Sequence, residues 1–249
     1  MIKEQRFDFI LNELKVHEQV MYEQLALALD VSEDTIRRDI EHLYRNGLLS
    51  KIRGGAILLS KNPLTFHDRT AFLTEEKDII ALKAQQFVKN GNTIFMDGGT
   101  TICAISSRFP ADIQLRVVTN NQALIEVLAK FKHIEIIGLG GVYDRNTATL
   151  TGGATCKEAE KYIADVYLMG TCGVDDKLGV TATWETDANV KRSMLGNARK
   201  VVALSNHGHL GHVEAFKVCG MRDVHALITN LDANHPDLNS FRNLGVQIV

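Results

Sequence analysis

From Glu75 to its last residue, the chain alternates short apolar runs with longer segments of helical character, and few folds accept this pattern. Each apolar run has the length of a strand and ends in Gly, Asn or Thr. Strands that alternate with helices in this way form a largely parallel sheet with crossover helices. The pattern therefore predicts an α/β domain with a mostly parallel, Rossmann-like sheet over residues 75–249.

The individual elements of this domain are expected where the runs lie. The strands are expected at 93–96, 116–119, 135–139, 166–170, 200–204, 226–229 and 246–249. The helices are expected at 76–89, 101–108, 122–131, 156–162 and 188–198. Residues 60–74 contain Asn62 followed by Pro63 and have no clear period, so we interpret them as a linker.

The first 59 residues have a different pattern, that of three short helices followed by two strands. Apolar residues recur there at the spacing of one helical face. They are Phe7, Ile10, Leu11 and Leu14 in the first helix, Leu25, Ala28 and Leu29 in the second (22–29), and Ile36, Ile40 and Leu43 in the third (33–46). Ser32 is suited to cap the start of the third helix, and Gly47 is suited to end it.

The third helix has the features of a DNA recognition helix. Its exposed face presents Thr35, Arg37, Arg38 and Glu41. Over residues 35–56, basic residues outnumber acidic ones by five to two. A recognition helix enters the major groove by its N-terminal end, so its first exposed turns must be polar and basic. Two short helices, a tight turn and this third helix therefore predict a helix-turn-helix.

The residues after Gly47 predict a β-wing. Residues 48–53 alternate roughly like a strand, Gly54 and Gly55 provide a turn, and residues 56–59 can return as a second strand. Such a wing would place Lys51 or Arg53 near the DNA backbone. We therefore expect a winged helix-turn-helix over residues 1–59. Its expected DNA contacts are Ser32, Thr35, Arg37, Arg38, Lys51 and Arg53.

Periodicity alone leaves a simpler interpretation open, a three-helix packing module whose arginines form surface ion pairs with Asp39 or Glu41. The sequence itself favours DNA binding. Residues 31–40 read Val-Ser-Glu-Asp-Thr-Ile-Arg-Arg-Asp-Ile, and Leu43, Gly-Leu-Leu at 47–49 and Arg-Gly-Gly-Ala at 53–56 follow. This string closely resembles the DNA-binding signature of the DeoR family of bacterial repressors.

The loop after the first strand of the larger domain is suited to bind an anion. Residues 97–101 read Asp-Gly-Gly-Thr-Thr and open a helix. The glycines allow close backbone approach, and the hydroxyls and the free N–H groups of the helix start can donate to a phosphate. Such a loop is often only a turn. Further loops at 119–121, 138–141 and 170–173 would, however, gather at the same edge of a parallel sheet.

The resemblance to the DeoR family extends along almost the whole chain. It rests on residues 76–77, 97–101, 118–120, 140–141, 151–152, 179–181 and 190–194, in order and spacing. The sensor domain of that family is related in fold to ribose-5-phosphate isomerase and to sugar-phosphate deaminases.

The resemblance implies an effector site in three parts. The phosphate would be held by Asp97, Gly98, Gly99, Thr100 and Thr101; the pocket would be lined by Asn120 and Gly141; the sugar end would be faced by Glu185, Asp187 and Lys191. The alternative for the last three residues is a solvated helix face with an ion pair between Asp187 and Lys191.

Residues 205–212 depart from the family pattern. The family usually has an acidic residue, small polar residues and a lysine there, whereas this chain has Ser-Asn-His-Gly-His-Leu-Gly-His. This difference puts the usual effector contacts of the segment in doubt. The spacing of His207, His209 and His212 leaves a metal site open as an alternative, although no Asp or Cys stands beside them at ligand spacing.

The composition indicates where the protein works. The N-terminus lacks the apolar core of a signal peptide, and no apolar run approaches the roughly 18–20 residues that span a bilayer. Its four cysteines stand singly, which suits reduced thiols. We therefore expect a cytoplasmic protein with neither a membrane partner nor a cofactor.

The function expected from these features is that of a repressor of a sugar or polyol catabolic operon, not of an enzyme. It would bind double-stranded operator DNA as a homo-oligomer, dimeric at least, under the control of a phosphorylated sugar or polyol. One alternative is a sugar-phosphate isomerase or deaminase with an appended DNA-binding module, in which Asp97, Glu185 or Asp187 would be the general base. Another is a metal-responsive regulator that uses the three histidines.

Overall fold

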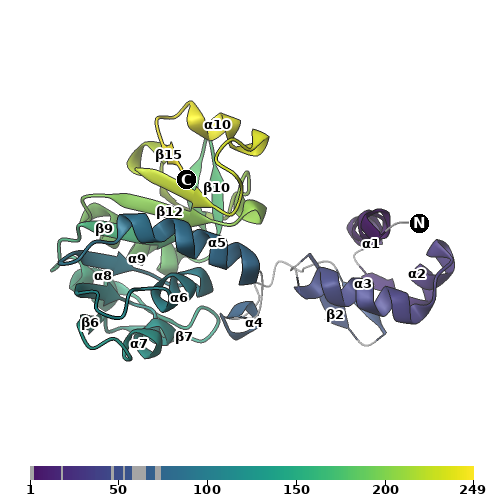
Figure 1. Cartoon of the computed structure of the whole chain (residues 1–249), viewed down its shortest axis with the longest axis horizontal. Coiled ribbons are helices and arrows are strands. Elements are labelled where there is room, and N and C mark those ends of the chain that lie inside the picture. The colour runs from purple at the N-terminus through teal and green to yellow at the C-terminus, as the bar shows by residue number, and fades with distance from the viewer. Residues whose placement is uncertain (1–2, 18, 46–47, 53, 58–65, 71–73) are drawn as a thin grey trace. The chain divides into compact units, whose positions relative to one another are not determined.

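The computed structural model describes residues 3–17, 19–45, 48–52, 54–57, 66–70 and 74–249 (Figure 1). The chain forms two compact units, Met1–Thr74 and Glu75–Val249. Arg53 and most of the predicted linker lie outside the described residues. The described part of the linker contains a short helix, α4 (Phe66–Thr70). This helix was not predicted, because a little over one turn is too short to show a period.

The first unit contains the three predicted helices and a small antiparallel sheet. The helices are α1 (Lys3–His17), α2 (Tyr22–Leu29) and α3 (Glu33–Arg45), and the predicted wing strands are β2 (Ser50–Ile52) and β3 (Gly55–Ile57). A third strand, β1 (Gln19–Met21), pairs with β3 and was not predicted, since three residues are too few to show alternation. The strand order is β1-β3-β2.

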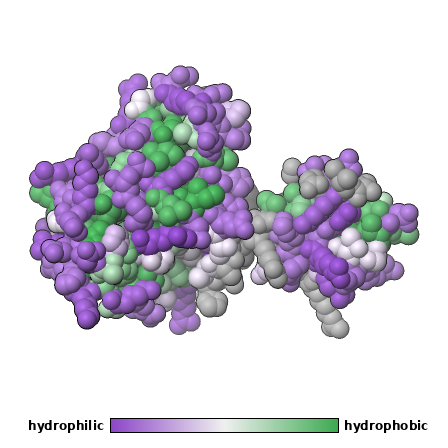
Figure 2. Space-filling view, viewed as in Figure 1, coloured by the Kyte–Doolittle hydropathy of each residue, from purple (hydrophilic) through white to green (hydrophobic). Residues whose placement is uncertain are grey.

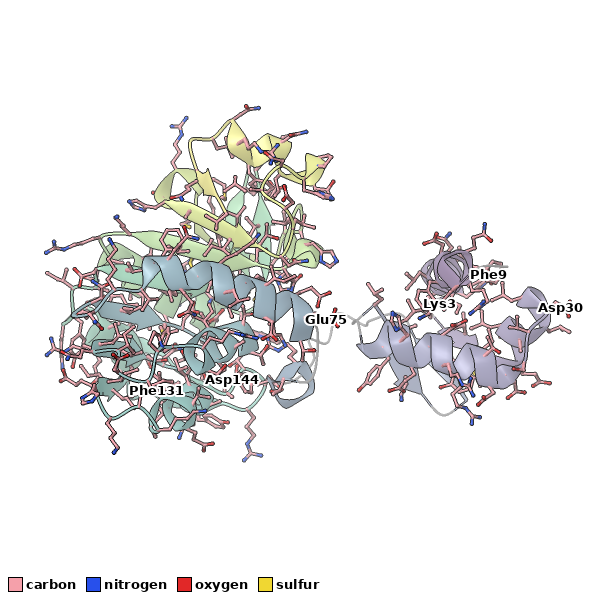
Figure 3. All side chains as sticks on the ribbon, viewed as in Figure 1. Lys3, Phe9, Asp30, Glu75, Phe131 and Asp144 are labelled. Atoms are coloured by element: carbon pink, nitrogen blue, oxygen red, sulfur yellow. The ribbon has the colours of Figure 1, made fainter. Side chains whose placement is uncertain are left out.

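A sharp turn sets α3 against α2. Asp30, labelled in Figure 3, ends α2 in the left-handed region with φ 51° and ψ 50°. Aspartate visits this region more readily than most residues with a side chain. Ser32 then accepts a hydrogen bond from the backbone N–H of Thr35 through its Oγ, at 3.2 Å, which confirms it as the predicted cap of α3.

The core of the first unit lies where the three helices meet. Its fully buried members include Ile10, Leu14, Ile36, Ile40 and Leu43, all of them predicted. One assignment in α2 was wrong: Ala26 is buried, whereas Ala28 is exposed. The buried face of α2 is therefore formed by Leu25, Ala26 and Leu29. The sequence did not show which alanine is buried, because apolar residues occur on every side of this helix.

A buried ion pair joins α1 to α3. Asp39 is 3% exposed, and its carboxylate accepts from Arg6 through Nε at 2.6 Å and through Nη2 at 3.1 Å. This bidentate geometry satisfies both partners away from water. Asp39 is therefore paired with α1 and not, as the packing-module interpretation allowed, with the arginines of its own helix.

The second unit is built on a seven-stranded sheet in which every neighbouring pair is parallel, as predicted. Its strands are β4 (Thr93–Met96), β5 (Leu115–Thr119), β6 (Ile134–Gly138), β9 (Val166–Gly170), β12 (Val201–Ser205), β14 (Ala226–Thr229) and β15 (Gln247–Ile248). The main helices are α5 (Thr74–Ala84), α6 (Thr100–Ser107), α7 (Gln122–Leu128), α8 (Gly153–Ala159) and α9 (Glu185–Gly196).

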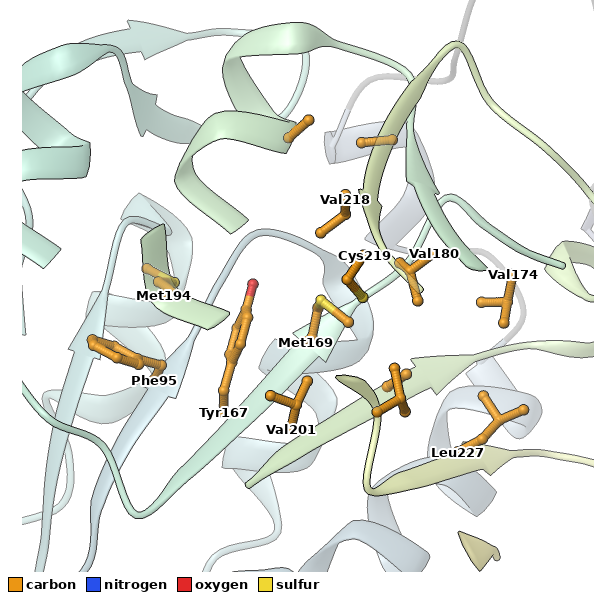
Figure 4. Close-up of a cluster of buried hydrophobic side chains, with 14 of the residues drawn as sticks. Phe95, Tyr167, Met169, Val174, Val180, Met194, Val201, Val218, Cys219 and Leu227 are labelled. Atoms are coloured by element: carbon orange, nitrogen blue, oxygen red, sulfur yellow. The ribbon is translucent and has the colours of Figure 1, made fainter. Parts of the chain in front are cut away.

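Helices cover both faces of this sheet, so the unit has three layers (Figure 1). On one face, Phe95 and Tyr167 pack with residues of α8 and α9; Figure 4 shows Tyr167 standing in this cluster beside Phe95 and Met169. On the other face, Ile94 and Met96 pack with residues of α5, α6 and α7. The alternation of neighbouring residues between two buried faces explains why the strands are apolar throughout.

Several short elements of the second unit were not predicted. They are the hairpin of β7 (Val142–Asp144) and β8 (Thr149–Thr151), the strands β10 (Gly173–Asp175), β11 (Gly179–Ala182) and β13 (Phe216–Cys219), and the helix α10 (Asn239–Arg242). None exceeds four residues, too few to establish a period. In addition, α9 begins three residues before its predicted start at 188, which places Glu185 and Asp187 in its first turn.

The strand order locates a topological switch point between β4 and β9. The order is β15-β14-β12-β9-β4-β5-β6, so the chain proceeds from β4 toward one side and from β9 toward the other. In open parallel sheets, ligands bind beyond the carboxyl ends of the strands at such a switch point. The residues that follow β4 and β9, Asp97 and Thr171, therefore lie where a ligand site is expected.

The surface is mainly polar. Hydrophilic side chains cover most of the face of each unit shown in Figure 2, with apolar residues in smaller groups between them. Among the helices that the structure describes, none is both long and apolar enough to cross a membrane.

The ion pair of Arg6 and Asp39 should contribute strongly to the stability of the first unit. Asp39→Ala should lower its free energy of unfolding by on the order of 3 kcal/mol, because the arginine loses a buried partner. Far-UV circular dichroism during urea unfolding would measure this. The matched control is Glu41→Ala, which breaks the exposed pair with Lys51 and should cost less than about 1 kcal/mol. Equal losses for both variants would contradict the prediction.

Candidate functional site

The first candidate surface is the exposed side of α3 and the wing. Arg37 and Arg38 are exposed in the first turns of α3, and Ser32 and Thr35 lie at its start with their hydroxyl oxygens 2.9 Å apart. Lys51 of the wing is exposed, and its Nζ lies 2.5 Å from Glu41 Oε2. The hydrogen bond with Glu41 raises the pKa of Lys51, so this lysine is charged. The structure thus exposes basic groups on α3 and on the wing, as predicted, while Arg53 lies outside the described residues.

The second candidate site lies at the switch point of the larger sheet, around Asp97. This carboxylate is 0% exposed and follows directly after β4. It accepts from the hydroxyl of Tyr167 at 2.6 Å, from the backbone N–H of Gly170 at 2.8 Å and from Lys191 Nζ at 2.5 Å. A buried carboxylate is stable only when it is paired and hydrogen-bonded in this way. Burial, and then the negative charge of Asp97, raise the pKa of Tyr167, so its hydroxyl keeps its proton as a donor.

Lys191 is equally committed to protein partners. Its Nζ donates to Asp97 and to the carbonyl oxygen of Gly170 at 2.9 Å, and it lies 3.6 Å from Asp187 Oδ2. Burial alone would lower the pKa of Lys191, but the charges of Asp187 and Asp97 outweigh it and raise the pKa. The predicted pair of Asp187 and Lys191 therefore exists, but with Lys191 only 3% exposed it does not belong to a solvated helix face. Glu185, by contrast, is exposed at the first position of α9.

The glycine loop between β4 and α6 is held in a fixed shape. Gly99 precedes α6 with φ 123°, which residues with a side chain rarely adopt. A Cβ on Gly98 would lie 2.6 Å from Thr149 Cγ2, so β8 packs directly on the loop. Asn121 Nδ2 lies 3.3 Å from the carbonyl oxygen of Asp97 and 3.5 Å from that of Gly99. These contacts hold the carbonyl groups of the loop at the start of α6, where Thr100 is buried and Thr101 is half-buried.

Asn120 directly follows β5, and Gly141 lies in the loop between β6 and β7. The side chain of Asn120 donates to the carbonyl oxygen of Leu150 at 2.9 Å. Its Oδ1 is buried and has no hydrogen-bond partner among the described residues. Gly141 has φ 147°, and a Cβ there would collide with Thr155 and with the backbone of Thr151. A hydroxyl donor from a ligand could satisfy Asn120 Oδ1, whereas Gly141 is fixed by close packing.

Three further residues shape this site, and two of them, Asn121 and Gly170, belong to loops that the sequence placed at this edge of the sheet without giving these residues a role. Tyr167 and Gly170 complete the shell of Asp97, and Asn121 holds the glycine loop. Tyr167 reads as a core residue in an apolar strand, so no sequence signal points to it. Nearby, Lys77 of α5 is 9% exposed, and its charge opposes the effect of burial on the pKa of Cys103. Burial raises the pKa of that thiol to about 11.

The three histidines after β12 do not form one group. The ring of His207 lies 3.0 Å from Asn230 Nδ2, whereas the ring of His212 lies 2.9 Å from Glu214 Oε1. Over the described ranges of the chain, no set of three or more His, Cys, Asp or Glu side chains is placed to hold a metal ion. The structure therefore gives the metal-responsive alternative no support.

Comparison with known proteins finds two family models along this chain. A model described as the DeoR-like helix-turn-helix domain matches residues 6–62, and a model described as the DeoR C terminal sensor domain matches residues 73–231.

Two curated relatives cover nearly the whole chain. The HTH-type transcriptional repressor GlcR of Bacillus subtilis is 31% identical over 251 residues, which cover 100% of this chain and 96% of the relative. The glycerol-3-phosphate regulon repressor of Escherichia coli is 31% identical over 231 residues, which cover 92% of each chain. These names are those of regulators, as predicted, and not of enzymes.

Solved structures give a weaker likeness. Ribose 5-phosphate isomerase A of Methanocaldococcus jannaschii matches with a TM-score of 0.40 and 14% identity, over 54% of this chain and 53% of that one. The sorbitol operon regulator SorC of Klebsiella pneumoniae matches with a TM-score of 0.38 and 12% identity, over 82% and 90%. At these TM-scores we draw no functional conclusion from either.

The Asp97 cluster should behave as one energetic unit. Lys191→Met should lower the free energy of unfolding of the larger unit by about 3–5 kcal/mol, because it leaves buried carboxylates without their cation. The double variant Asp97→Asn with Lys191→Met should cost at least about 1 kcal/mol less than the sum of the single changes. The fluorescence of Trp184, the single tryptophan of the chain, would follow unfolding. Lys130→Met, at an exposed position, is the control, and strict additivity of the two changes would rule out the coupling.

Proposed function

This chain belongs to the DeoR family, and we propose that it is a repressor of a sugar or polyol catabolic operon, controlled by a small phosphorylated effector. The N-terminal unit would bind operator DNA and the C-terminal unit would bind the effector. The observation that carries the DNA-binding part is the exposed pair Arg37 and Arg38 in the first turns of α3, within a segment that matches a DeoR-like helix-turn-helix model. An exposed, basic start of the recognition helix is what major-groove entry requires.

The effector part of the proposal rests on the glycine loop at the switch point. With Asp97 and Lys191 committed to each other, the loop offers mainly neutral donors: backbone N–H groups at the start of α6 and the hydroxyls of Thr100 and Thr101. Donors of this kind, together with the helix dipole, suit a phosphate. We assign Asp97 and Lys191 the role of holding the loop in place, and not of contacting the phosphate. A relative whose name concerns glycerol 3-phosphate supports a small phosphorylated polyol or sugar as the class of ligand.

The remainder of the effector would lie against residues from neighbouring loops and α9. Asn120 Oδ1, buried and unpartnered among the described residues, is an acceptor for a ligand hydroxyl. Gly141 would line the pocket beside it, and Glu185 and Asp187, in the first turn of α9, would accept from further hydroxyls. These assignments make the free sugar a weaker ligand than its phosphate ester, since the loop at Gly98 and Gly99 would lose its anion.

The enzyme alternative loses one of its three candidate bases. A general base must be able to take a proton from the substrate. The carboxylate of Asp97 already accepts three hydrogen bonds and lies against a charged lysine. Only Glu185 and Asp187 remain, and the names of the relatives give no indication of catalysis.

The proposed repressor should be an oligomer. Dimers with this DNA-binding motif occupy two half-sites about one helical turn, or a multiple of it, apart. Light scattering of the full chain should therefore give a mass of at least twice the 27.6 kDa of one chain. Footprinting on DNA selected from a random library should show paired half-sites. A monomer that protects one short site would contradict this part of the proposal.

Gly99→Ala should abolish the response to effector while leaving DNA affinity unchanged. The reason is that φ 123° is unfavourable for alanine, so the loop would move away from the phosphate. The measurement is DNA binding with and without glycerol 3-phosphate, ribose 5-phosphate and glucose 6-phosphate, each beside its unphosphorylated counterpart. A thermal-shift screen of the same panel identifies the ligand. A ligand present at about 100 times its Kd stabilises the folded protein by about 2.7 kcal/mol, which raises the melting temperature.

Gly91→Ala is the matched control for this variant. Gly91 also has a positive φ, 81°, and open space around a Cβ, but it lies before β4, at the opposite edge of the sheet from Gly99. The Gly91→Ala variant should therefore keep its response to the effector. A normal response of Gly99→Ala, or equal binding of the free sugar and its phosphate, would show that the loop is only a turn.

A further inference from the structure

Arg37 and Arg38 are adjacent in the sequence but have different surroundings. The side chain of Arg38 is 81% exposed, and its Nη2 lies 2.8 Å from Oδ2 of Asp34, four residues earlier on α3. The guanidinium of Arg37 instead lies over the ring of Tyr22, with Cζ 5.9 Å from the ring centroid. One arginine is thus braced by a carboxylate of its own helix, and the other by an aromatic ring of α2.

The buried residues of α3 show how the two side chains face the DNA. Ile36, Ile40 and Leu43 point into the core and define the inner side of the helix. At 100° per residue, Asp34 and Arg38 project from the side opposite to these three residues. Arg37 projects about a quarter turn away from them, on the flank that meets Tyr22. When α3 lies in the major groove, its outermost side faces the bases and its flanks face the groove walls, which are lined with phosphates.

The flank that carries Arg37 borders a hollow of about 540 Å³ in the first unit. Its walls are Met21 of β1 and the first residues of α2, 22–24, together with Glu33, Arg37 and Gly54. The backbone N–H of Tyr22 donates to the carbonyl oxygen of Gly54 at 2.8 Å, so the start of α2 and the turn of the wing are fixed to each other. Arg37 is the one basic side chain among the described residues of this wall.

We propose that Arg38 contacts the edge of a base pair in the operator, whereas Arg37 contacts a backbone phosphate beside the hollow. This division of roles rests on the proposed DNA-binding function. Asp34 is the positioning residue for Arg38, because its pair with Nη2 holds the guanidinium in place while the remaining N–H groups can donate to the O6 and N7 acceptors of guanine. Tyr22 is the positioning residue for Arg37, because its ring restricts the guanidinium to the flank.

The two acidic residues that line the hollow lead to a second, independent prediction. Glu23 and Glu33 are exposed on the same wall as Arg37. If a phosphate approaches this wall, both carboxylates oppose it, so removing either charge should strengthen the binding of any DNA sequence. Glu23→Gln and Glu33→Gln are therefore variants of opposite sign to Arg37→Ala at the same place.

The experiment uses the full chain and a library of double-stranded DNA with a randomised centre. Wild type and variants each select their preferred sequences. The affinities for the wild-type consensus duplex and for a scrambled duplex of the same composition are then measured at several salt concentrations. The consensus-to-scrambled ratio reports base reading, and the slope of log affinity against log salt reports the number of phosphate contacts.

Arg38→Ala should lose the preference at one base pair of each half-site and lower the consensus-to-scrambled ratio about 5–150-fold, the range for one bidentate base contact. Arg37→Ala should keep the selected sequence, weaken both duplexes by the same factor and reduce the salt slope by about 1 for each subunit bound. Arg38→Lys keeps the charge but not the fork of donors, so it should lose base preference without a change in salt slope.

The positioning residues have their own readouts. Asp34→Asn should reduce the same base preference as Arg38→Ala, and should add nothing when Arg38 is already replaced. Tyr22→Leu should weaken both duplexes in the wild-type background but not in the Arg37→Ala background. Because Arg37 and Arg38 are exposed, their variants should melt at the wild-type temperature, which shows that the fold is kept.

The inference would be overturned if Arg37→Ala changed the selected sequence, if Arg38→Ala left it intact, or if Glu33→Gln altered base preference instead of raising affinity for both duplexes. These results would leave the proposed DNA-binding function intact, because the wild type would still select a sequence. They would overturn only the roles assigned to the two arginines. A wild-type chain that selects no sequence and binds neither duplex would instead overturn the proposed function together with this inference.

Discussion

The carboxylate of Asp97 is the point at which three elements of the larger unit meet. It directly follows β4, it accepts from Tyr167 and Gly170 of β9, and it is paired with Lys191 of α9. Removing a carboxylate from water costs several kcal/mol unless charge and hydrogen bonds replace the lost hydration, so these donors must stay together. The positions of β4, β9 and α9, and with them the shape of the glycine loop, depend on this cluster.

The same principle governs the smaller unit. There the buried pair of Arg6 and Asp39 fixes α1 against α3, and with it the orientation of the recognition helix. In both units a carboxylate, Asp97 or Asp39, is paired with a cation inside the protein, although the sequence pattern assigned Asp97 to the effector and left Asp39 as a surface partner of the α3 arginines. The groups left for ligands are different in kind: exposed guanidinium groups on α3, and backbone N–H groups and hydroxyls at the start of α6.

Most of the fold was predictable because its signals are local. The seven parallel strands were found near their observed positions, since each is a run of apolar residues bounded by turn residues. The three helices and the wing of the first unit were found from their period and from Ser32 as a cap. The hairpin of β7 and β8 was missed because its three-residue strands have no measurable period, yet Thr149 of β8 packs directly on Gly98.

The sequence by itself determined that the chain has a helix-turn-helix with exposed arginines and a parallel sheet with a glycine loop after β4, because periodicity and short motifs depend on neighbouring residues. Only the tertiary structure decided which charged side chains are paired inside the protein and which remain available to a ligand. Asp97 and Lys191 are 94 residues apart, and their pairing follows from the strand order that brings β4 beside β9. The tertiary structure also separated Arg37 from Arg38, because the ring that braces Arg37 comes from another helix. A sequence records which side chains can carry charge, but the burial and partners of each charge are set by contacts between distant segments.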